Sequence, residues 1–391
     1  MEVKEDIVIV GAGISGLATA LALHRVGIRS LLLEASESLR TTGFAFATWS
    51  NAWKALDALG ISDSLRQQYQ RLSGTGEHEA RCLVRKTLLE TLSKELPSGT
   101  IRYSSKLLFI EESGYFKLLH LADGTIFRTK VLIGCDGVNS VVAKWLGFKK
   151  PAFTGRHAIR GCASISHGFE PKFLQFFGDG VRSGFLPYDA NSVYWFFTWS
   201  PNTDQEKEVE KSPAELRQVV LSKLGKIPSE VKAVIEKTAL DSIFSSPLIC
   251  RNPWELILSG NISKGNVCVA GDALHPTTPD LGQGACSALE DGVVLARCLA
   301  EALLEKPTRK TKEKGEEEED EYERIEMGLN KYGKERKWRS FELISLSYIV
   351  GAIQQSKGKL LNFLRDDCLA HFLASLFLKV GDFDCGTLIR S

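Results

Sequence analysis

The apolar residues of this chain follow two spacings, and the changes between them outline its elements. Short apolar runs at residues 7–10, 130–134 and 266–270 have the composition of buried parallel strands. Between residues 157 and 199, short runs rich in Phe, Tyr and Trp alternate with turns that contain Gly or Pro, a pattern typical of antiparallel strands. Long segments with helical apolar spacing follow, above all residues 285–304. The pattern predicts a parallel sheet with helices and an inserted antiparallel sheet.

The first apolar run opens residues 7–34, which read as strand, glycine turn, helix and strand. Gly11 permits a tight turn, Gly13 lets a pyrophosphate approach the backbone, and Gly16 lets the helix pack closely on the sheet. The helix N-terminus offers amide donors to phosphates, and Glu34 at the end of the second strand can accept from ribose hydroxyls. This stretch predicts an adenine dinucleotide site, because a glycine turn used only for packing leaves Glu34 unexplained.

The two later apolar runs also end in a glycine beside an acid. The run at 130–134 leads to Asp136 and Gly137, and the run at 266–270 leads to Asp272. After Asp272, a connection with prolines and glycines precedes the apolar helix at 285–304. Such a connection is stiff and open to close backbone approach, and the helix directs its N-terminus at whatever lies over it. We therefore expect the third segment to hold an anionic group.

Length, charge and cysteine content narrow the class of protein. A chain of 391 residues can form two intimately joined domains, and its net charge of +1 gives no reason to expect a nucleic-acid partner. Its 9 cysteines form no CxxC pair and no Cys/His cluster, so we expect no metal site and no disulfide framework. No signal sequence precedes the first strand and no apolar run reaches membrane-spanning length, so we expect a cytoplasmic protein without membrane contact.

Four single residues invite competing interpretations. Arg40 either contacts a phosphate or adenine or is a solvated surface residue, and Arg85, a cation at a helix start, suggests an anionic partner from elsewhere, such as a phosphate. His275, between Leu274 and Pro276, is better explained as shaping its loop than as transferring protons. Cys286 is better explained as a small packed residue than as a reactive thiol. The charged stretch 305–322 is expected to be a solvated or disordered loop.

The three glycine-and-acid segments together resemble the flavin-dependent monooxygenases of the aromatic-hydroxylase type, the family of para-hydroxybenzoate hydroxylase and salicylate hydroxylase. The matching residues are Gly11, Gly13, Gly16, Glu34, Cys135-Asp136-Gly137, Gly271-Asp272-Ala273-Leu274-His275-Pro276 and Pro279-Asp280-Leu281-Gly282-Gln283-Gly284. The resemblance covers about the first 300 residues. Residues 49–60, 156–161 and 384–386 are in addition similar to plant monooxygenases akin to salicylate hydroxylase.

The resemblance implies that FAD is held by all three segments. The cofactor-binding residues that it implies are Gly11, Gly13, Gly16, Glu34, Ala35, Arg40, Arg85, Asp136, Gly137, Asp272, Pro279, Gly282, Gln283 and Gly284. The aromatic residues proposed for the substrate pocket are Phe44, Phe46, Phe177, Phe185 and Trp195. Neither a catalytic side chain nor the oligomeric state can be named from these motifs.

The same resemblance implies the reaction. FAD would be reduced by NAD(P)H, which docks transiently because the chain has only one complete dinucleotide fingerprint. The reduced flavin would capture O2 as a hydroperoxide and pass one oxygen to a small aromatic or olefinic substrate. Two alternatives stay open, a non-catalytic FAD-binding regulatory protein and an FAD oxidoreductase of another reaction type. A plain NAD-dependent dehydrogenase does not account for the segment at Gly271 and Asp272.

The expected fold is α/β, with a Rossmann-like FAD-binding domain, an inserted antiparallel β-sheet substrate domain and C-terminal helices. The FAD-binding domain is predicted in three parts, at 1–75, 101–155 and 263–304. The other predicted segments are a substrate-domain or connecting helix at 76–100, the substrate sheet at 156–262, and a charged loop with helices at 305–391. The chain departs from the family pattern at Leu274, where alanine is usual, and we expect this larger side chain to narrow the space beside the flavin.

Overall fold

A computed structural model describes most of the chain and gives the bounds of its helices and strands. The described residues are 2–41, 44–165, 169–178, 180–201, 211–225, 227–258, 261–304, 314–354, 375–376 and 378–388.

The first sheet has the strand order β14-β15-β8-β1-β2-β5. Its members are β1 (Glu2–Val10), β2 (Leu31–Leu33), β5 (Ile101–Arg102), β8 (Ile126–Gly134), β14 (Ser263–Lys264) and β15 (Val267–Val269). β1 runs parallel to β2 and β8, and β15 runs parallel to β8. The antiparallel strands β6 (Leu107–Ser113) and β7 (Phe116–Leu121) extend the sheet from β8. The last four residues of β1 are all buried, as a strand covered on both faces requires.

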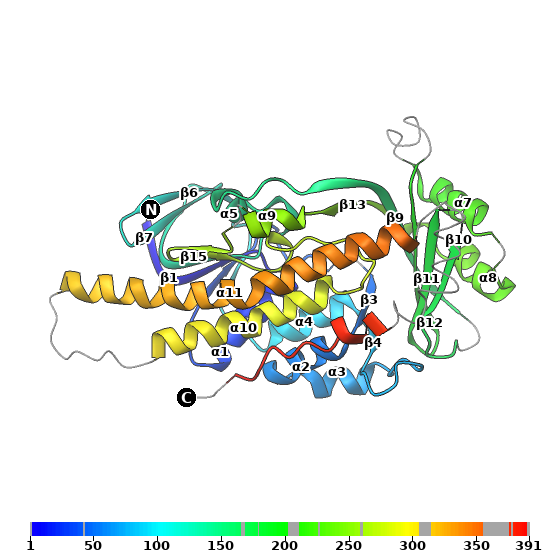
Figure 1. The fold of residues 1–391 in the computed structure, drawn as a ribbon, viewed down its shortest axis with the longest axis horizontal. Helices are drawn as coiled ribbons and strands as arrows, with labels where there is room; N and C mark the ends of the chain where they lie inside the picture. The colour runs from blue at the N-terminus through cyan, green and yellow to red at the C-terminus, as the bar shows by residue number, and fades with distance from the viewer. Residues whose placement is uncertain are drawn as a thin grey trace.

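Helices cover this sheet, and the long ones run beside it from end to end (Figure 1). They are α1 (Ile14–Arg25), α2 (Ser50–Leu59), α3 (Ser62–Gln68), α4 (Arg85–Lys94), α5 (Val141–Trp145), α9 (Pro253–Leu258), α10 (Gly284–Leu304) and α11 (Lys314–Gln354). Short 3-10 turns stand at η1 (Gly137–Asn139), η2 (Leu240–Ser242) and η3 (Gly271–Ala273). α10 packs directly on α1 at Gly292, where an added Cβ would lie 2.8 Å from the backbone of Ala18 and Thr19. This contact packs the first half of α10 closely against α1.

The second sheet is antiparallel, with the order β10-β11-β12-β9-β13. Its strands are β9 (Ala152–Ser164), β10 (Leu174–Gly178), β11 (Val181–Asp189), β12 (Ser192–Trp199) and β13 (Ile243–Cys250). It lies at one end of the molecule with α7 (Pro213–Lys223) and α8 (Ser229–Lys237) on its outer side (Figure 1). A small sheet of β3 (Ala45–Thr48) and β4 (Arg81–Val84) lies between the two larger sheets.

The predicted fold class is confirmed, and the differences are local. β9 begins at Ala152, four residues before the predicted start of the second sheet at 156. The acidic part of the charged stretch, from Lys314 onward, is the first part of α11 and not a loop. Its charges are compatible with a helix because the segment is rich in Glu and Lys, which are good helix formers. Of the charged loop and helices predicted at 305–391, residues 305–313, 355–374, 377 and 389–391 lie outside the described residues.

Candidate functional site

Three parallel strands of the first sheet end side by side and bring distant segments together. Gly11 follows β1, Cys135 follows β8, and Gly271 follows β15, and these strands are neighbours in the sheet. A Cβ on Gly11 would lie 2.4 Å from the carbonyl oxygen of Cys135, and one on Gly271 would lie 2.7 Å from Cβ of Ser15. The carboxyl ends of parallel strands are where open α/β sheets bind their ligands. The three predicted segments therefore form one edge.

The glycine turn has room for a ligand at one position and for none at the other two. Gly11 adopts a φ of +101°, and a Cβ on Gly16 would lie 1.9 Å from the carbonyl oxygen of Gly11. No atom lies within 4 Å of where a Cβ would stand on Gly13. Gly13 precedes the first residue of α1, whose leading amides have no helical acceptor. These features fit a pyrophosphate drawn close to the backbone at Gly13.

Glu34 holds the glycine turn in place as well as closing the site. The residue is 4% exposed, and its carboxylate accepts from the backbone N–H of Ala12 and of Ser36, at 2.9 Å each. A carboxylate has further lone pairs, so these bonds leave capacity for a ribose hydroxyl. Ala35 is exposed beside it, and the largely exposed Arg40 places Nε 3.6 Å from Glu34 Oε1.

Arg85 links the adenosine side of this edge to the third segment. It is the first residue of α4, its backbone N–H donates to the carbonyl of Phe44 at 3.0 Å, and its Nη1 donates to the carbonyl of Arg40 at 2.5 Å. Burial lowers the pKa of the Arg85 guanidinium, and the nearby carboxylates of Asp272 and Glu34 oppose that shift. Two acids thus influence this cation, and a phosphate as its partner stays a prediction.

Asp136 has a local role that the sequence did not reveal. Its carboxylate accepts from Ser140 Oγ at 2.5 Å and from the backbone N–H of Val141 at 2.7 Å, so it supports Ser140, the N-cap residue of the short helix α5. Burial raises the pKa of Asp136 while these hydrogen bonds oppose the change. Gly137 next to it has a φ of +77° and open space where a Cβ would stand. The room for a ligand in this segment is therefore at Gly137.

The third segment exposes Asp272 and turns its neighbours inward. Loss of hydration to the surrounding protein atoms raises the pKa of the Asp272 carboxyl group. Because the side chain is exposed to solvent, this desolvation is only partial. Leu274 is fully buried in the main apolar core, so the expectation that it narrows the space beside the flavin is wrong. Gln283 is 3% exposed, and its Oε1 accepts from Asn51 Nδ2 at 2.8 Å. Gly282, Gly284 and the half-buried Pro279 carry the remaining backbone of this connection.

Asp291 of α10 fixes the turn that carries Asp272. Its Oδ2 accepts from the backbone N–H of Gly271 at 2.7 Å and lies 2.6 Å from His275 Nε2, and its Oδ1 accepts from Arg336 Nε at 2.6 Å. Burial alone raises the pKa of Asp291, but His275 and Arg336 outweigh it and hold that pKa well below its usual range. His275 is completely buried in this network, which agrees with a loop-shaping role.

The neighbouring acid, Glu290, ties α10 to two other helices. Its carboxylate pairs with Arg336 at 2.8 Å and with Arg339 at 2.8 Å, and it accepts from Asn51 Nδ2 at 2.5 Å. All of these groups are at most 6% exposed. Sequence analysis missed this cluster; its signal was a pair of adjacent acids within an otherwise apolar helix.

The second sheet has two faces, and two predicted pocket residues lie on the wrong one. Phe185 and Trp195 are fully buried among the apolar side chains of α7 and α8, and Trp195 Nε1 donates to Thr238 Oγ1 at 2.9 Å. Their assignment to the substrate pocket is wrong, because side chains alternate between faces along a strand. Phe177, 38% exposed, pairs with Arg182 and so belongs to the opposite face.

That opposite face carries aromatic rings and meets the small sheet. The ring of Phe44, just before β3, lies 6.0 Å from that of Tyr194 and 5.3 Å from that of Phe244. Tyr194 in turn lies 6.3 Å from Phe196. Phe46, one residue into β3, is half-buried and packs against the main core.

An ion-pair cluster joins the same face to the third segment. Asp280 is fully buried and pairs with Arg156 at 2.7 Å and with Arg182 at 3.2 Å. Burial alone raises the pKa of Asp280, but the two arginines outweigh it and lower that pKa. A Cβ on Gly351 of α11 would lie 2.5 Å from Asp280 Oδ2, so this helix packs on the pair. The cluster, which the sequence did not predict, fixes the connection at Pro279 to Gly284 against the second sheet.

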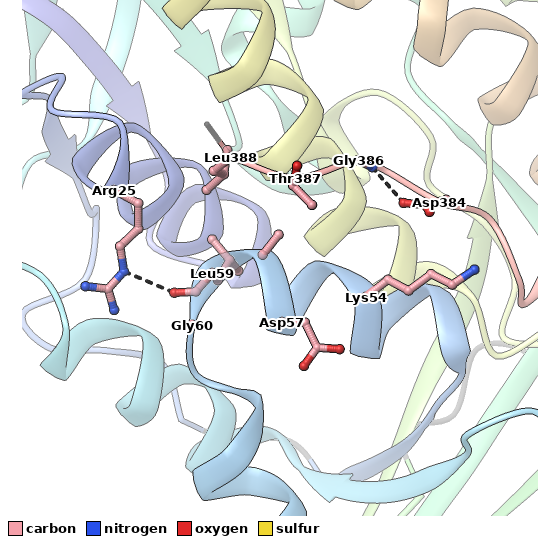
Figure 2. A pocket seen from close by; sticks show the side chains of 10 residues that line it. Arg25, Lys54, Asp57, Leu59, Gly60, Asp384, Gly386, Thr387 and Leu388 are labelled. Atoms are coloured by element: carbon pink, nitrogen blue, oxygen red, sulfur yellow. Dashed lines mark hydrogen bonds between the residues drawn. The ribbon is translucent and has the colours of Figure 1, made fainter. Parts of the chain in front are cut away.

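Two surface hollows lie away from this edge. One, of about 450 Å³, lies between the ends of α1 and α2 and the C-terminal segment, at the far end of α1 from Gly13 (Figure 2). The other, of about 480 Å³, lies beside the first residues of β1, at the amino end of that strand. Charged side chains contribute to the lining of both, and neither includes a residue predicted to bind FAD. The residues at the strand ends, and not these hollows, therefore define the candidate site.

The described residues show neither a metal-binding cluster nor a membrane-spanning helix. Within the described ranges, no group of three or more His, Cys, Asp or Glu side chains is arranged to hold a metal ion. None of the helices among the described residues combines the length and the apolar character that crossing a bilayer requires.

A glycine turn closed by an acid, two further strand ends with Gly137 and Asp272, and an aromatic second sheet define the class of FAD-dependent oxidoreductases that oxygenate their substrates. Comparison with known proteins agrees. Residues 112–320 match a family described as FAD binding domain, and residues 6–103 match one described as FAD dependent oxidoreductase. The chain belongs to the FAD-dependent monooxygenase family.

Individual relatives make the assignment more specific. Monooxygenase 2 of Arabidopsis thaliana is 54% identical over 99% of this chain and 99% of its own length. Monooxygenase 1 of the same plant is 36% identical over 98% of this chain and 99% of its own length. Among solved structures, Klebsiella pneumoniae HpxO complexed with FAD and uric acid has the same fold, with a TM-score of 0.77 at 22% identity over 96% of each chain.

Proposed function

We propose that the protein uses NAD(P)H and O2 to oxygenate a small aromatic or olefinic substrate with FAD as cofactor. Phe44 is the observation that carries this proposal. Its backbone carbonyl accepts from the N–H of Arg85, at the edge assigned to FAD, while its ring contacts Tyr194 and Phe244 of the aromatic face. An enzyme of this kind needs its cofactor edge and its substrate face to be neighbours.

The residues proposed to hold FAD divide by what they offer. Gly11, Gly13 and Gly16 supply backbone for the pyrophosphate, Glu34 accepts from the adenosine ribose, and Arg85 and Asp272 flank the chain between the two halves of the cofactor. Gly137, Gly282 and Gly284 allow close backbone approach, and α10 directs its positive end at the flavin. Bound FAD would supply the redox chemistry with NAD(P)H and O2. The protein orients the substrate and keeps water out.

Purified holoprotein tests the proposal directly. We expect a yellow protein that oxidises NADPH or NADH, faster in the presence of a suitable aromatic compound, and that places one atom from ¹⁸O2 into the product. A protein that binds FAD but oxidises neither nucleotide with any compound would be a regulatory flavoprotein. Oxidation and product formation without ¹⁸O in the product would indicate an oxidoreductase of another reaction type.

We further propose a cytoplasmic enzyme without membrane contact. The cysteines of the described ranges are all free thiols, and most of them are buried, which suits a reducing compartment. Two further relatives, 27% and 28% identical, are an FAD-dependent urate hydroxylase of Mycolicibacterium vanbaalenii and a 6-hydroxynicotinate 3-monooxygenase of Pseudomonas fluorescens, which supports a small ring compound as substrate here. Fractionation of the source tissue tests the compartment.

A further inference from the structure

Residues 380–386, here called the strap, lie across elements that carry the proposed FAD site. The strap contacts α2 at Asn51 and α11 at Arg339. Its end runs beside α2, where Asp384 and Gly386 line the hollow between the ends of α1 and α2 (Figure 2). Both helices also form hydrogen bonds with the connection that follows Asp272 in the chain. The strap is therefore one step away from that connection on two sides.

The first link to the FAD site runs through Asn51. Its backbone N–H, in the first turn of α2, donates to the carbonyl of Gly381 at 2.9 Å. Within the described structure the N-cap residue of α2 forms no side-chain cap, so the strap supplies an acceptor that this helix start lacks. The side-chain amide of the fully buried Asn51 donates to Gln283 Oε1 at 2.8 Å. A single residue thus connects the strap to Gln283, one of the residues predicted to bind FAD.

The second link is an apolar contact. Val380, the first residue of the strap, is 2% exposed and packs in a small apolar cluster with Leu281. Leu281 is 3% exposed and lies between Pro279 and Gly282. The side chain of the strap therefore supports directly the backbone that is predicted to approach the flavin.

The third link is electrostatic. The ring centroid of Phe383 lies 5.2 Å from Arg336 Cζ and 4.8 Å from Arg339 Cζ. The carbonyl of Val380 accepts from Arg339 Nη2 at 2.8 Å. The face of an aromatic ring attracts guanidinium groups, so the strap helps to hold both arginines in place. These arginines neutralise the two adjacent acids of α10, of which Asp291 fixes the turn that carries Asp272.

We propose that the strap is a positioning element for FAD, coupled to the cofactor in both directions. When the strap is in place, it pre-organises residues 279–284 and the turn before them, so FAD binds without having to order this backbone. Bound FAD in turn holds the strap in place by the same factor, because coupling between two sites is reciprocal. We expect a factor of about tenfold, which is typical of such coupling. This inference rests on the FAD site of the proposed function.

Proteolysis of the parent protein tests the coupling without any substitution. Lys379 is exposed and directly precedes the strap, so trypsin can cleave after it once the strap has left its place. The rate at which the C-terminal peptide is released is followed by mass spectrometry, in apoprotein and at rising FAD concentrations. We expect FAD to slow this cleavage by about tenfold and then to have no further effect, because FAD still binds the protein with an open strap, only more weakly.

Two other results of this experiment would overturn the inference. A cleavage rate that does not change with FAD would mean that the strap and the cofactor are not coupled. A rate that keeps falling in proportion to the FAD concentration would mean that cleavage requires global unfolding, since only a state without FAD affinity gives that dependence. The strap would then not open by itself.

Substitutions at Phe383 measure the same coupling from the side of FAD. Titration of the apoprotein with FAD, followed by quenching of flavin fluorescence, should show an affinity about tenfold lower in Phe383→Ala. Phe383→Tyr should bind FAD as the parent does, because it keeps the ring face that contacts the arginines. Urea unfolding of each apoprotein shows whether the variant is folded.

Phe116→Ala is the matched control. The ring of Phe116 is also partly buried and also lies against an arginine, 3.8 Å from Arg128 Cζ, but beside the first residues of β1. Its removal should change FAD affinity by less than about twofold, because distant sites without shared partners act independently. A folded Phe383→Ala protein with the FAD affinity of the parent, or an equal loss of affinity in Phe116→Ala, would refute the inference.

The outcomes separate this inference from the proposed function. A protein whose strap is not coupled to FAD can still oxidise NAD(P)H and oxygenate a substrate, which would leave the proposed function intact. A protein that shows the coupling but places no ¹⁸O in any product would retain the strap and lose the proposed reaction.

Discussion

The edge of the first sheet and the aromatic face of the second sheet are built in opposite ways. The edge is made of backbone: Gly11, Gly16 and Gly271 are required because neighbouring atoms leave no room for a Cβ. The face is made of side chains on a regular antiparallel ladder, where successive residues of a strand point alternately to one face and the other. A glycine that the backbone requires is easy to recognise in the sequence, whereas the face to which a strand side chain points is not. Five substitutions test this contrast.

The largest effect is expected at the closest backbone contact. Gly11→Ala places a Cβ 2.4 Å from the carbonyl oxygen of Cys135 at a φ of +101°, so we expect destabilisation of more than about 4 kcal/mol and loss of FAD binding. Urea unfolding and flavin content measure the two. A stable, yellow Gly11→Ala protein would contradict the arrangement of the strand ends.

The next effect concerns the buried support of the third segment. Asp291→Asn leaves Arg336 without a full counter-charge, so we expect a loss of about 4 kcal/mol in the free energy of unfolding. The pKa of Asp291 is lowered by folding, so its contribution is present above the unfolded pKa of about 4 and is lost as pH falls through the lower folded value. Unfolding from pH 6 to pH 3 should therefore show a steeper loss of stability in the parent than in Asp291→Asn, and equal slopes would refute this.

A pair of substitutions, with a smaller expected effect, compares the two faces of the second sheet. Phe185→Ala opens a cavity against α7 and α8 and should cost about 3 kcal/mol, while Phe177→Ala on the open face should cost less than about 1 kcal/mol. Thermal unfolding of the two variants decides between the faces. Equal costs would mean that the alternation has been assigned incorrectly.

The smallest effect is the most specific. Gly13→Ala meets no atom within 4 Å, so the stability of the protein without cofactor should stay within about 0.5 kcal/mol of the parent. Its FAD affinity should fall by about tenfold, or ~1.4 kcal/mol, because the added methyl group occupies space proposed for the pyrophosphate. Unchanged FAD affinity would remove Gly13 from the proposed site.

The same contrast explains how far sequence analysis could go. The three strand ends were predictable because glycine spacing and an acid at Glu34 have few other uses. Phe185 and Trp195 were placed on the wrong face because aromatic residues occupy both sides of this sheet. The sequence pattern therefore did not determine which face each residue occupies. Leu274 was misjudged because a motif names positions without saying which way their side chains turn.

The long-range ion pairs could not be predicted at all. Arg182 and Asp280 are 98 residues apart, and Asp291 and Arg336 are 45 apart, so only the folded chain brings them together. The charged start of α11 was also misjudged, since a run of acids resembles a solvated loop until it is attached to the rest of a 41-residue helix.

The ion pairs between α10 and α11 have a consequence for biosynthesis. Glu290 and Asp291 are translated well before Arg336 and Arg339, and they stay uncompensated until those arginines have been added. A growing polypeptide therefore cannot complete the ion pairs that support the turn at Asp272 until α11 has been synthesised. We expect flavin capture to be a late event, absent from chains stalled at residue 330 and present in chains stalled far enough beyond residue 354 for α11 to emerge.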